Sequence, residues 1–335
     1  MTKIAVIGAT TWGTTLSIVN ATSNKDNEIY LLTRSPYETE KLVNDNQNSK
    51  FLPGYPFPSN IHITHSNSEA LNNTELIIIA VPSMNFRENL KSINDYVPST
   101  SIFLSATKGI EISSGLRMTE IIKEELTNIS DHNICVLSGP NLAKEIIEGK
   151  PCSSVVASTD ETTIKNVQKI LNSELIRLYG NTDIVGVEIA GAMKNITAIA
   201  SGISEGLNFG DNAKSSLITR GLAEMTRFGI SMGANESTFS GLAGMGDLIA
   251  TCSSSKSRNT QLGIRLGQGE SIEDIQSSMV NVAEGVSTTQ AVMKIAKSMK
   301  VNMPLTEAVY QVLFENIKPI DAYKSLMNRS IKLEN

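Results

Sequence analysis

In the first half of the chain, short apolar runs alternate with stretches whose apolar residues recur at helical spacing. Short apolar runs bounded by polar residues or glycine are typical of strands that are buried on both faces. Helical spacing occurs between several of these runs, for example at residues 82–94 and 117–127. The alternation predicts parallel strands with helices on both faces of the sheet. The expected strands span residues 4–7, 29–32, 61–64, 76–81, 102–105, 134–137, 154–157 and 176–179.

The second half of the chain has a different pattern. After about Asp183 the strand patterns stop, and helical spacing continues. Pro304 and Pro319 stand where helices are expected to begin, since proline fits the first turn of a helix. At 335 residues the chain is long enough for two domains. We predict an α/β fold, with a doubly wound domain over residues 1–182 and an all-helical domain over residues 183–335. The expected helices span residues 184–203, 215–229, 259–266, 286–299 and 305–316.

Composition narrows the classes of protein that this chain can be. The formal net charge is −5 without a block of like charges, so nucleic acid is not an expected partner. No apolar run approaches the ~20 residues of a membrane helix, and none resembles a signal peptide, so we expect no membrane insertion. Cys135, Cys152 and Cys252 are odd in number and widely spaced, which predicts reduced thiols in a cytoplasmic protein. The histidines have no ligand spacing, and no metal is expected.

The first strand ends in a glycine turn that predicts an anion site. Gly8 ends the apolar run and Gly13 lies at the start of a helical pattern, so free N–H groups and the helix dipole meet there. The dinucleotide fingerprint of Rossmann-like domains has glycine at both positions and at a third between them, where this chain has Thr10. A β-branched residue resists positive φ and adds bulk where a pyrophosphate should approach. A P-loop is excluded because Thr14, not lysine, follows Gly13. An ordinary strand-turn-helix connection remains the alternative.

The second expected strand ends at Arg34 rather than at an acidic residue. A site built for NAD usually has Asp or Glu here to hold the ribose hydroxyls. Arginine instead offers a planar fork that suits a 2′-phosphate. The sequence therefore favours NADP, with NAD possible; a solvated surface arginine is the alternative.

Two apolar segments of the second half each contain a charged residue. Lys194 is the only charge in an apolar stretch after Glu188, where desolvation would lower its pKa and fit it to proton transfer. Asp247 lies among glycines and apolar residues, with Thr251 four positions later. A buried aspartate needs a partner, and a lysine would serve. A lysine that extends to the surface and an aspartate that caps a helix are the alternatives.

Further polar residues stand where ligands bind in such folds. Ser257, Arg258 and Asn259 combine a hydroxyl, a bidentate cation and an amide at an expected helix start, as in a phosphate or carboxylate clamp. Ser257 could equally be an N-cap. Lys108 and the turn at Gly139 and Asn141 follow strands, at the sheet edge where open α/β sheets bind ligands.

These motifs together resemble those of the NAD(P)-dependent glycerol-3-phosphate dehydrogenases of the bacterial type. The resemblance covers essentially the whole chain, and its helical half is similar to that of 6-phosphogluconate dehydrogenase. It is carried by G-A-T-T-W-G at residues 8–13, T-K-G-I at 107–110, S-G-P-N-L-A at 138–143, V-E-I-A-G-A-M-K-N at 187–195, G-D-L…T-C at 246–252, S-R-N at 257–259 and V-A-E-G at 282–285.

The resemblance implies an activity and a set of site residues. The family interconverts dihydroxyacetone phosphate and sn-glycerol 3-phosphate, which supplies the backbone of phospholipids; a homodimer is the expected assembly. Lys194 would exchange the proton at the C2 oxygen, with Asp247 as a second catalytic residue. The residues expected to line the substrate are Lys108, Gly139, Asn141, Lys194, Asp247, Ser257, Arg258 and Asn259. The residues expected to contact the cofactor are Gly8, Thr11, Trp12, Gly13, Arg34, Lys108, Ala143, Arg258, Val282 and Glu284.

Two departures from the family keep other hypotheses open. Thr10 stands where the family has glycine, and Asn141 where it has serine or threonine. A β-hydroxyacid dehydrogenase would share the two-domain plan but usually has its lysine and asparagine four residues apart, whereas Lys194 and Asn195 are adjacent. A non-catalytic NADP sensor would explain Thr10, but it would need neither Lys194 nor Asp247.

Overall fold

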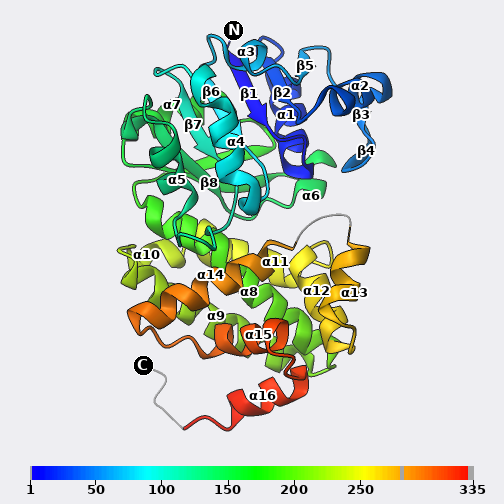
Figure 1. The fold of residues 1–335 in the computed structure, drawn as a ribbon, viewed down its shortest axis with the longest axis vertical. Helices are drawn as coiled ribbons and strands as arrows, with labels where there is room; N and C mark the ends of the chain where they lie inside the picture. Colours follow the sequence, from blue (N-terminus) through cyan, green and yellow to red (C-terminus); the bar gives the residue numbers. More distant parts are fainter. Residues whose placement is uncertain (1, 280–282, 331–335) are drawn as a thin grey trace. The chain divides into compact units, whose positions relative to one another are not determined.

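The computed structural model describes residues 2–279 and 283–330, which form two compact units (Figure 1). The first unit comprises Met1–Lys108 and Leu116–Glu188, and the second comprises Gly109–Gly115 and Ile189–Asn335. The units divide within helix α8 (Ile184–Gly206). The domain boundary that we predict between residues 182 and 183 stays a prediction.

The first unit contains an eight-stranded sheet in the order β10-β9-β8-β7-β6-β1-β2-β5. Strand order reverses between β1 and β6, which makes this edge the switch point where doubly wound sheets bind ligands. The expected strands are all present, with ends that differ by two residues or fewer. The strands are β1 (Lys3–Ile7), β2 (Glu28–Leu32), β5 (Ile61–Thr64), β6 (Leu76–Ile79), β7 (Ile102–Ser105), β8 (Ile134–Ser138), β9 (Cys152–Ser158) and β10 (Ile176–Asn181).

Two features of the strands depart from the expected parallel sheet. β9 runs antiparallel to β8, with Leu137 opposite Val156, although it pairs in parallel with β10. An antiparallel hairpin that was not among the expected strands lies between β2 and β5, formed by β3 (Gln47–Asn48) and β4 (Leu52–Pro56). Strand direction depends on how the connections pack, and hydropathy alone does not encode it.

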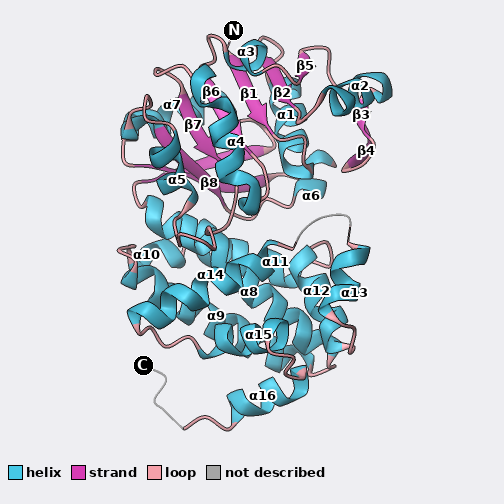
Figure 2. Ribbon diagram, viewed as in Figure 1, coloured by secondary structure: helices cyan, strands magenta, loops and turns pink. Residues whose placement is uncertain are grey.

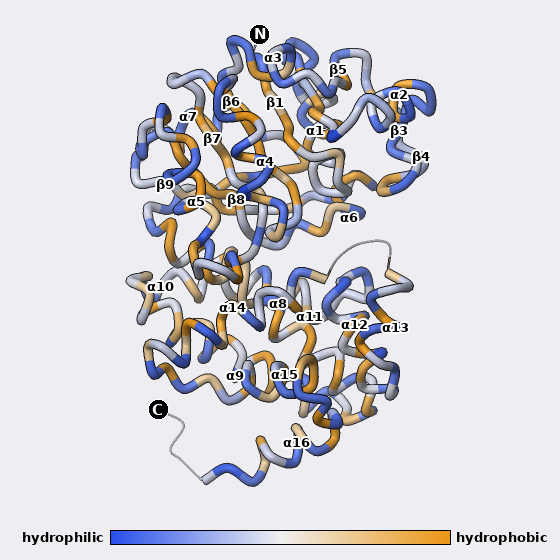
Figure 3. The backbone as a smooth tube through the Cα atoms, viewed as in Figure 1, coloured by the Kyte–Doolittle hydropathy of each residue, from blue (hydrophilic) through white to orange (hydrophobic). Residues whose placement is uncertain are grey.

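Alternate residues of the central strands enter two cores, one on each face of the sheet. Ile4 and Val6 belong to one core, and Ala5 and Ile7 to the other, because successive side chains of a strand point to opposite faces. Figure 3 shows the apolar character of β1, β6 and β7 along their length. Helix α1 covers the first core with Leu16 and Val19, while the second core includes apolar residues of α3, α4 and α5. This arrangement confirms the prediction of helices on both faces.

The helices of the first unit connect the strands and begin with recognisable caps. Ser35, Ser66 and Asp160 each accept a backbone N–H at the start of a helix. The helices are α1 (Thr11–Ser23), α2 (Pro36–Asp45), α3 (Asn67–Leu71), α4 (Phe86–Ile93), α5 (Met118–Glu125), α6 (Ala143–Ile147) and α7 (Glu161–Leu171), with 3₁₀ turns at Ser83–Asn85, Asn94–Tyr96 and Asp131–Asn133.

The second unit contains no strand within the residues that the structure describes, as Figure 2 shows, and this confirms the predicted helical half. Pro304 and Pro319 begin helices, as expected. A short π-helix, Leu242–Gly246, leads directly into α11. The helices after α8 are α9 (Gly210–Ser231), α10 (Glu236–Phe239), α11 (Asp247–Ser253), α12 (Arg258–Gly267), α13 (Ile272–Ser278), α14 (Glu284–Met299), α15 (Pro304–Phe314) and α16 (Pro319–Met327).

Helix α8 corrects one expectation from composition. Among the described residues it is the one helix long and apolar enough to cross a membrane, with a mean hydropathy of 1.2 over its most apolar window. The expectation that no segment approaches a membrane span was therefore wrong. Of that window, 94% is buried inside the protein, as in the core helix of a soluble protein. The absence of membrane insertion stays a prediction.

Candidate active site

The turn between β1 and α1 requires its two glycines. Gly8 has a φ of 107°, and a Cβ there would lie 2.7 Å from Val81 Cγ1. A Cβ on Gly13 would lie 2.1 Å from the carbonyl oxygen of Gly8. No side chain fits at either position, so the start of α1 packs directly on the end of β1 at the switch point. This close packing is what the dinucleotide fingerprint requires of these positions.

Thr10 is accommodated without backbone strain. Its φ of −81° and ψ of 173° are those of extended backbone, so the concern about positive φ at a β-branched residue was wrong. The hydroxyl caps α1 by accepting the Gly13 N–H at 3.1 Å. It also donates to the carbonyl oxygen of Ala80, the residue after β6, at 2.8 Å. The Thr10 hydroxyl proton and the Gly13 N–H therefore both bond to groups of the protein and not to a ligand.

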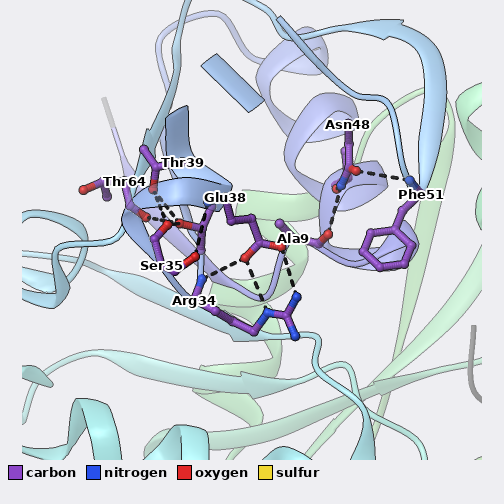
Figure 4. Close-up of polar contacts among 10 residues, drawn as sticks. Ala9, Arg34, Ser35, Glu38, Thr39, Asn48, Phe51 and Thr64 are labelled. Atoms are coloured by element: carbon purple, nitrogen blue, oxygen red, sulfur yellow. Dashed lines mark hydrogen bonds and ion pairs between the residues drawn. The ribbon is translucent and has the colours of Figure 1, made fainter. Parts of the chain in front are cut away.

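The β3–β4 hairpin is tied to this turn by Asn48, which the sequence analysis did not single out. Its buried amide donates to the Ala9 carbonyl oxygen at 2.9 Å, while Oδ1 accepts the Phe51 N–H (Figure 4). The same amide also donates to Thr14 Oγ1 at 2.8 Å. The Thr11 hydroxyl donates to the Phe51 carbonyl oxygen at 3.3 Å. Thr11 thus joins the turn to the hairpin. No local motif marked Asn48, because its bonds to Ala9 and Thr14 span more than thirty residues of sequence.

Arg34 lies at the end of β2 with an exposed side chain and an acidic partner. Its backbone N–H donates to Glu38 Oε2 at 2.9 Å, and its Nη2 lies 3.5 Å from Glu38 Oε1 (Figure 4). The arginine side chain is 75% exposed. The sequence analysis missed Glu38, although Ser35 and Glu38 have the S-x-x-E spacing of a capping box, which was the available signal.

Lys108, Gly139 and Asn141 come together at the ends of β7 and β8. Lys108 Nζ donates to the Gly139 carbonyl oxygen at 3.1 Å and to Asn141 Oδ1 at 2.9 Å. The amide nitrogen of Asn141 is buried and has no hydrogen-bond partner in the described part of the chain. A buried donor without a partner is costly, so this nitrogen is suited to donate a hydrogen bond to a ligand oxygen. Ala143 and Trp12, both half-buried, begin α6 and lie in the first turn of α1.

Lys194 and Asp247 form a buried ion pair in the second unit. Lys194 is 8% exposed and Asp247 2% exposed. Lys194 Nζ lies 2.6 Å from Asp247 Oδ1 and 2.7 Å from Thr251 Oγ1. An ammonium has three N–H donors, and within the described residues the third has no protein partner. The partner expected for Asp247 is therefore Lys194, and Asp247 begins α11 without acting as its N-cap.

A second polar chain runs beside this pair. Asn259 Nδ2 donates to Asn195 Oδ1, and Asn259 Oδ1 accepts the Gly285 N–H, each at 2.9 Å. These bonds connect α8, α12 and α14. Ser257 caps α12 by accepting the Thr260 N–H at 3.3 Å, which confirms the cap interpretation of this residue. Ser257 and Asn259 thus stabilise the local helix packing, and their contact with substrate stays a prediction.

The remaining predicted residues occupy helix starts in the second unit. Arg258 is exposed and begins α12, and Glu284 begins α14. Desolvation lowers the pKa of the Arg258 guanidinium, and the negative charge of Glu284 opposes this shift. Val282 lies outside the described residues. Among those that are described, no group of three His, Cys, Asp or Glu side chains could hold a metal ion.

Comparison with known proteins relates both units to one family. Residues 3–164 match the family described as NAD-dependent glycerol-3-phosphate dehydrogenase N-terminus, and residues 183–324 match its C-terminus. The chain belongs to this family. It is 46% identical over 98% of its length to glycerol-3-phosphate dehydrogenase [NAD(P)+] of Dehalococcoides mccartyi, covering 91% of that protein. It is 44% identical to the Corynebacterium glutamicum enzyme of the same description, with complete coverage of both chains.

Solved structures agree with this assignment. The crystal structure of glycerol-3-phosphate dehydrogenase from Coxiella burnetii has a TM-score of 0.92 and 34% identity, covering 97% of this chain and 98% of that one. A Ralstonia eutropha structure of the ketopantoate reductase family has a TM-score of 0.59 at 12% identity and shares the fold alone. The predicted Rossmann-like and helical architecture and the predicted family are confirmed.

Proposed function

We propose that this chain catalyses the reversible reduction of dihydroxyacetone phosphate to sn-glycerol 3-phosphate with NADPH or NADH. The observation that carries the proposal is the buried Lys194–Asp247–Thr251 cluster, in which two ammonium donors are held and a third is left for a ligand. Its family relatives are named for this reaction.

The first unit supplies residues that fit a dinucleotide. The close packing of Gly8 and Gly13 leaves the N-terminus of α1 open to an anion, and Thr11, Trp12, Arg34 and Ala143 border the same strand ends. Bound NADPH or NADH would supply the hydride that the C2 carbon receives. Lys108, Arg258 and Glu284 are further proposed cofactor contacts.

Lys194 would donate a proton to the C2 oxygen as this oxygen gains negative charge. Asp247 accepts one N–H of the ammonium and Thr251 accepts a second, so the remaining N–H is fixed in direction. In the reverse direction the neutral amine takes the hydroxyl proton. A charged donor in a buried site also stabilises the developing alkoxide more than it would in water.

The substrate's anionic and polar groups need donors. Lys108 and the unpartnered Asn141 amide nitrogen form one such group at the strand ends. Arg258, Ser257 and Asn259 lie together at the start of α12. We propose Lys108, Gly139 and Asn141 as the substrate contacts of the first unit, and Ser257, Arg258 and Asn259 as substrate contacts of the second.

Three finer statements belong to the same proposal. Arg34 makes NADPH the preferred cofactor because its exposed guanidinium suits a 2′-phosphate. The reaction takes place in the cytoplasm in a homodimer, without nucleic acid or metal. Its product feeds glycerophospholipid synthesis.

The test is the oxidation of NADPH and of NADH, followed by absorbance, upon addition of dihydroxyacetone phosphate to the purified chain. We expect oxidation with both cofactors, dependent on this substrate and with the higher kcat/KM for NADPH. If neither cofactor is oxidised while both bind, the non-catalytic sensor hypothesis replaces this one. Oxidation with β-keto acids but not with dihydroxyacetone phosphate would favour a β-hydroxyacid dehydrogenase.

A further inference from the structure

Glu38 lies where the first unit is expected to hold the adenosine ribose of the cofactor. Its Oε2 accepts the backbone N–H of Arg34 at 2.9 Å, and its Oε1 lies 3.5 Å from Arg34 Nη2 (Figure 4). The glutamate side chain is 20% exposed, whereas that of the arginine is 75% exposed. The carboxylate is therefore bonded to the backbone just after β2, and the guanidinium is the more exposed partner.

The surrounding hydrogen bonds fix the turn of backbone that carries this carboxylate. Ser35 Oγ accepts the Glu38 N–H at 3.2 Å and caps α2. Below it, the buried Thr33 hydroxyl lies 2.6 Å from the Thr39 hydroxyl, and Thr39 donates to the Ser35 carbonyl oxygen at 3.2 Å. The first turn of α2 thus brings the Glu38 carboxylate back to the end of β2. NAD-binding sites usually have their acidic residue at the position of Arg34, four residues earlier.

We propose that Glu38 is a specificity-determining residue for the cofactor, and that it limits the preference for NADPH that Arg34 creates. This inference rests on the proposed function. A 2′-hydroxyl can donate to the Glu38 carboxylate, which favours NADH. A 2′-phosphate meets an arginine whose charge is already balanced and a carboxylate that repels it. The pair therefore admits both cofactors, where Arg34 alone would select NADPH more strongly.

The test compares two nucleotides that differ at the 2′ position, adenosine 2′,5′-bisphosphate and adenosine 5′-monophosphate, by calorimetry on the full-length chain. Glu38→Gln removes the charge but keeps a side-chain oxygen that can accept the Arg34 N–H. We expect it to tighten the bisphosphate about tenfold (~1.4 kcal/mol). The monophosphate affinity should change by less than about threefold, a shift of under ~0.7 kcal/mol.

A matched control separates this local effect from a change in net charge. Glu40→Gln alters an exposed carboxylate of the same helix and should leave the ratio of the two affinities unchanged. When Arg34 is already replaced by alanine, adding Glu38→Gln should increase the affinity for the bisphosphate less. The alanine variant has no guanidinium that the loss of the Glu38 charge could make available to the 2′-phosphate. The gain should shrink with added salt, since the Arg34 guanidinium is exposed and salt screens its charge.

Two results would overturn the proposal. One is an unchanged affinity ratio in Glu38→Gln, and the other is an equal gain in Glu40→Gln. The ratio is measured within each variant, so partial unfolding cancels. Both nucleotides bind without substrate, so the result stands whether or not dihydroxyacetone phosphate is reduced.

Discussion

Lys194 of α8 and Asp247 of α11 form an ion pair in which both side chains are buried, with Nζ 2.6 Å from Oδ1. A buried charge that loses its partner keeps its desolvation cost and loses the attraction that offsets it. This relationship changes the expectation for Lys194→Met. From the sequence alone, removing a desolvated lysine should leave the stability unchanged or increase it.

The structure instead predicts that Lys194→Met lowers the free energy of unfolding by about 3–5 kcal/mol, because Asp247 remains buried and unpaired. The double variant Lys194→Met with Asp247→Asn removes both charges and should recover at least about half of that loss. Urea unfolding of the three proteins measures this. A single variant as stable as the original chain would show that the pair contributes nothing to the fold.

Arg34→Ala tests whether Arg34 contacts the 2′-phosphate of NADPH. We expect kcat/KM for NADPH to fall about tenfold or more, corresponding to at least ~1.4 kcal/mol, with NADH nearly unchanged. Initial rates with each cofactor measure this change. Equal losses for both cofactors would show that Arg34 does not contact the 2′-phosphate.

Thr10→Gly tests whether the departure from the fingerprint weakens cofactor binding. The substitution frees the Gly13 N–H and removes the side chain that adds bulk at the turn. We expect the dissociation constant for NADPH to fall about tenfold (~1.4 kcal/mol), with little change in kcat at saturating cofactor. Thr10→Ser keeps the hydroxyl and serves as the control, with an expected affinity near that of the original chain. Weaker binding by the glycine variant, measured by nucleotide fluorescence, would identify the threonine as a phosphate ligand.

We expect the Asp160 carboxyl to make the stability of the folded chain depend on pH. Desolvation acts to raise the pKa of its carboxyl, but the N–H groups of Thr163 and Thr162 donate to it, and the net result is a pKa below its usual value. The ionised form is thus favoured in the folded state, so its contribution is present above the unfolded pKa and is lost as the pH falls through the folded pKa.

Asp160→Ser provides a matched variant, since serine also caps helices but does not titrate. We expect urea midpoints near those of the original chain at neutral pH and a smaller fall between about pH 5 and pH 3. A fall of the same size in both proteins would place the acid sensitivity elsewhere.

Much of the fold was predictable because polar residues bound each apolar run of strand length at both ends. The strands at residues 61–64 and 102–105 have the predicted bounds for this reason. The direction of β9 was not predictable, since Cys152–Ser158 would be as apolar in either direction. The β3–β4 hairpin was missed because exposed proline and glycine carry no period.

Part of the candidate site was also predictable from the sequence, and part was not. The pairing of Asp247 with Lys194 followed from the cost of burying a lone carboxylate. Asn48 was missed because it acts through a hydrogen bond to a backbone atom 39 residues away, which only the folded chain brings near. Glu38 was missed although it lies three residues after Ser35, at a spacing that the sequence displays. Roles in binding and catalysis stay predictions for every residue of the site.

The central claim, that Lys194 exchanges the proton at the C2 oxygen, is tested most directly by kcat of Lys194→Met with saturating NADPH and dihydroxyacetone phosphate. The measurement is made under conditions in which the variant is folded and binds NADPH normally. We predict a fall in kcat of ~10²–10⁴, the range for a positioned acid-base group. The double variant with Asp247→Asn should remain as inactive although its stability recovers. A folded variant that keeps more than about a tenth of the original kcat would contradict the assignment.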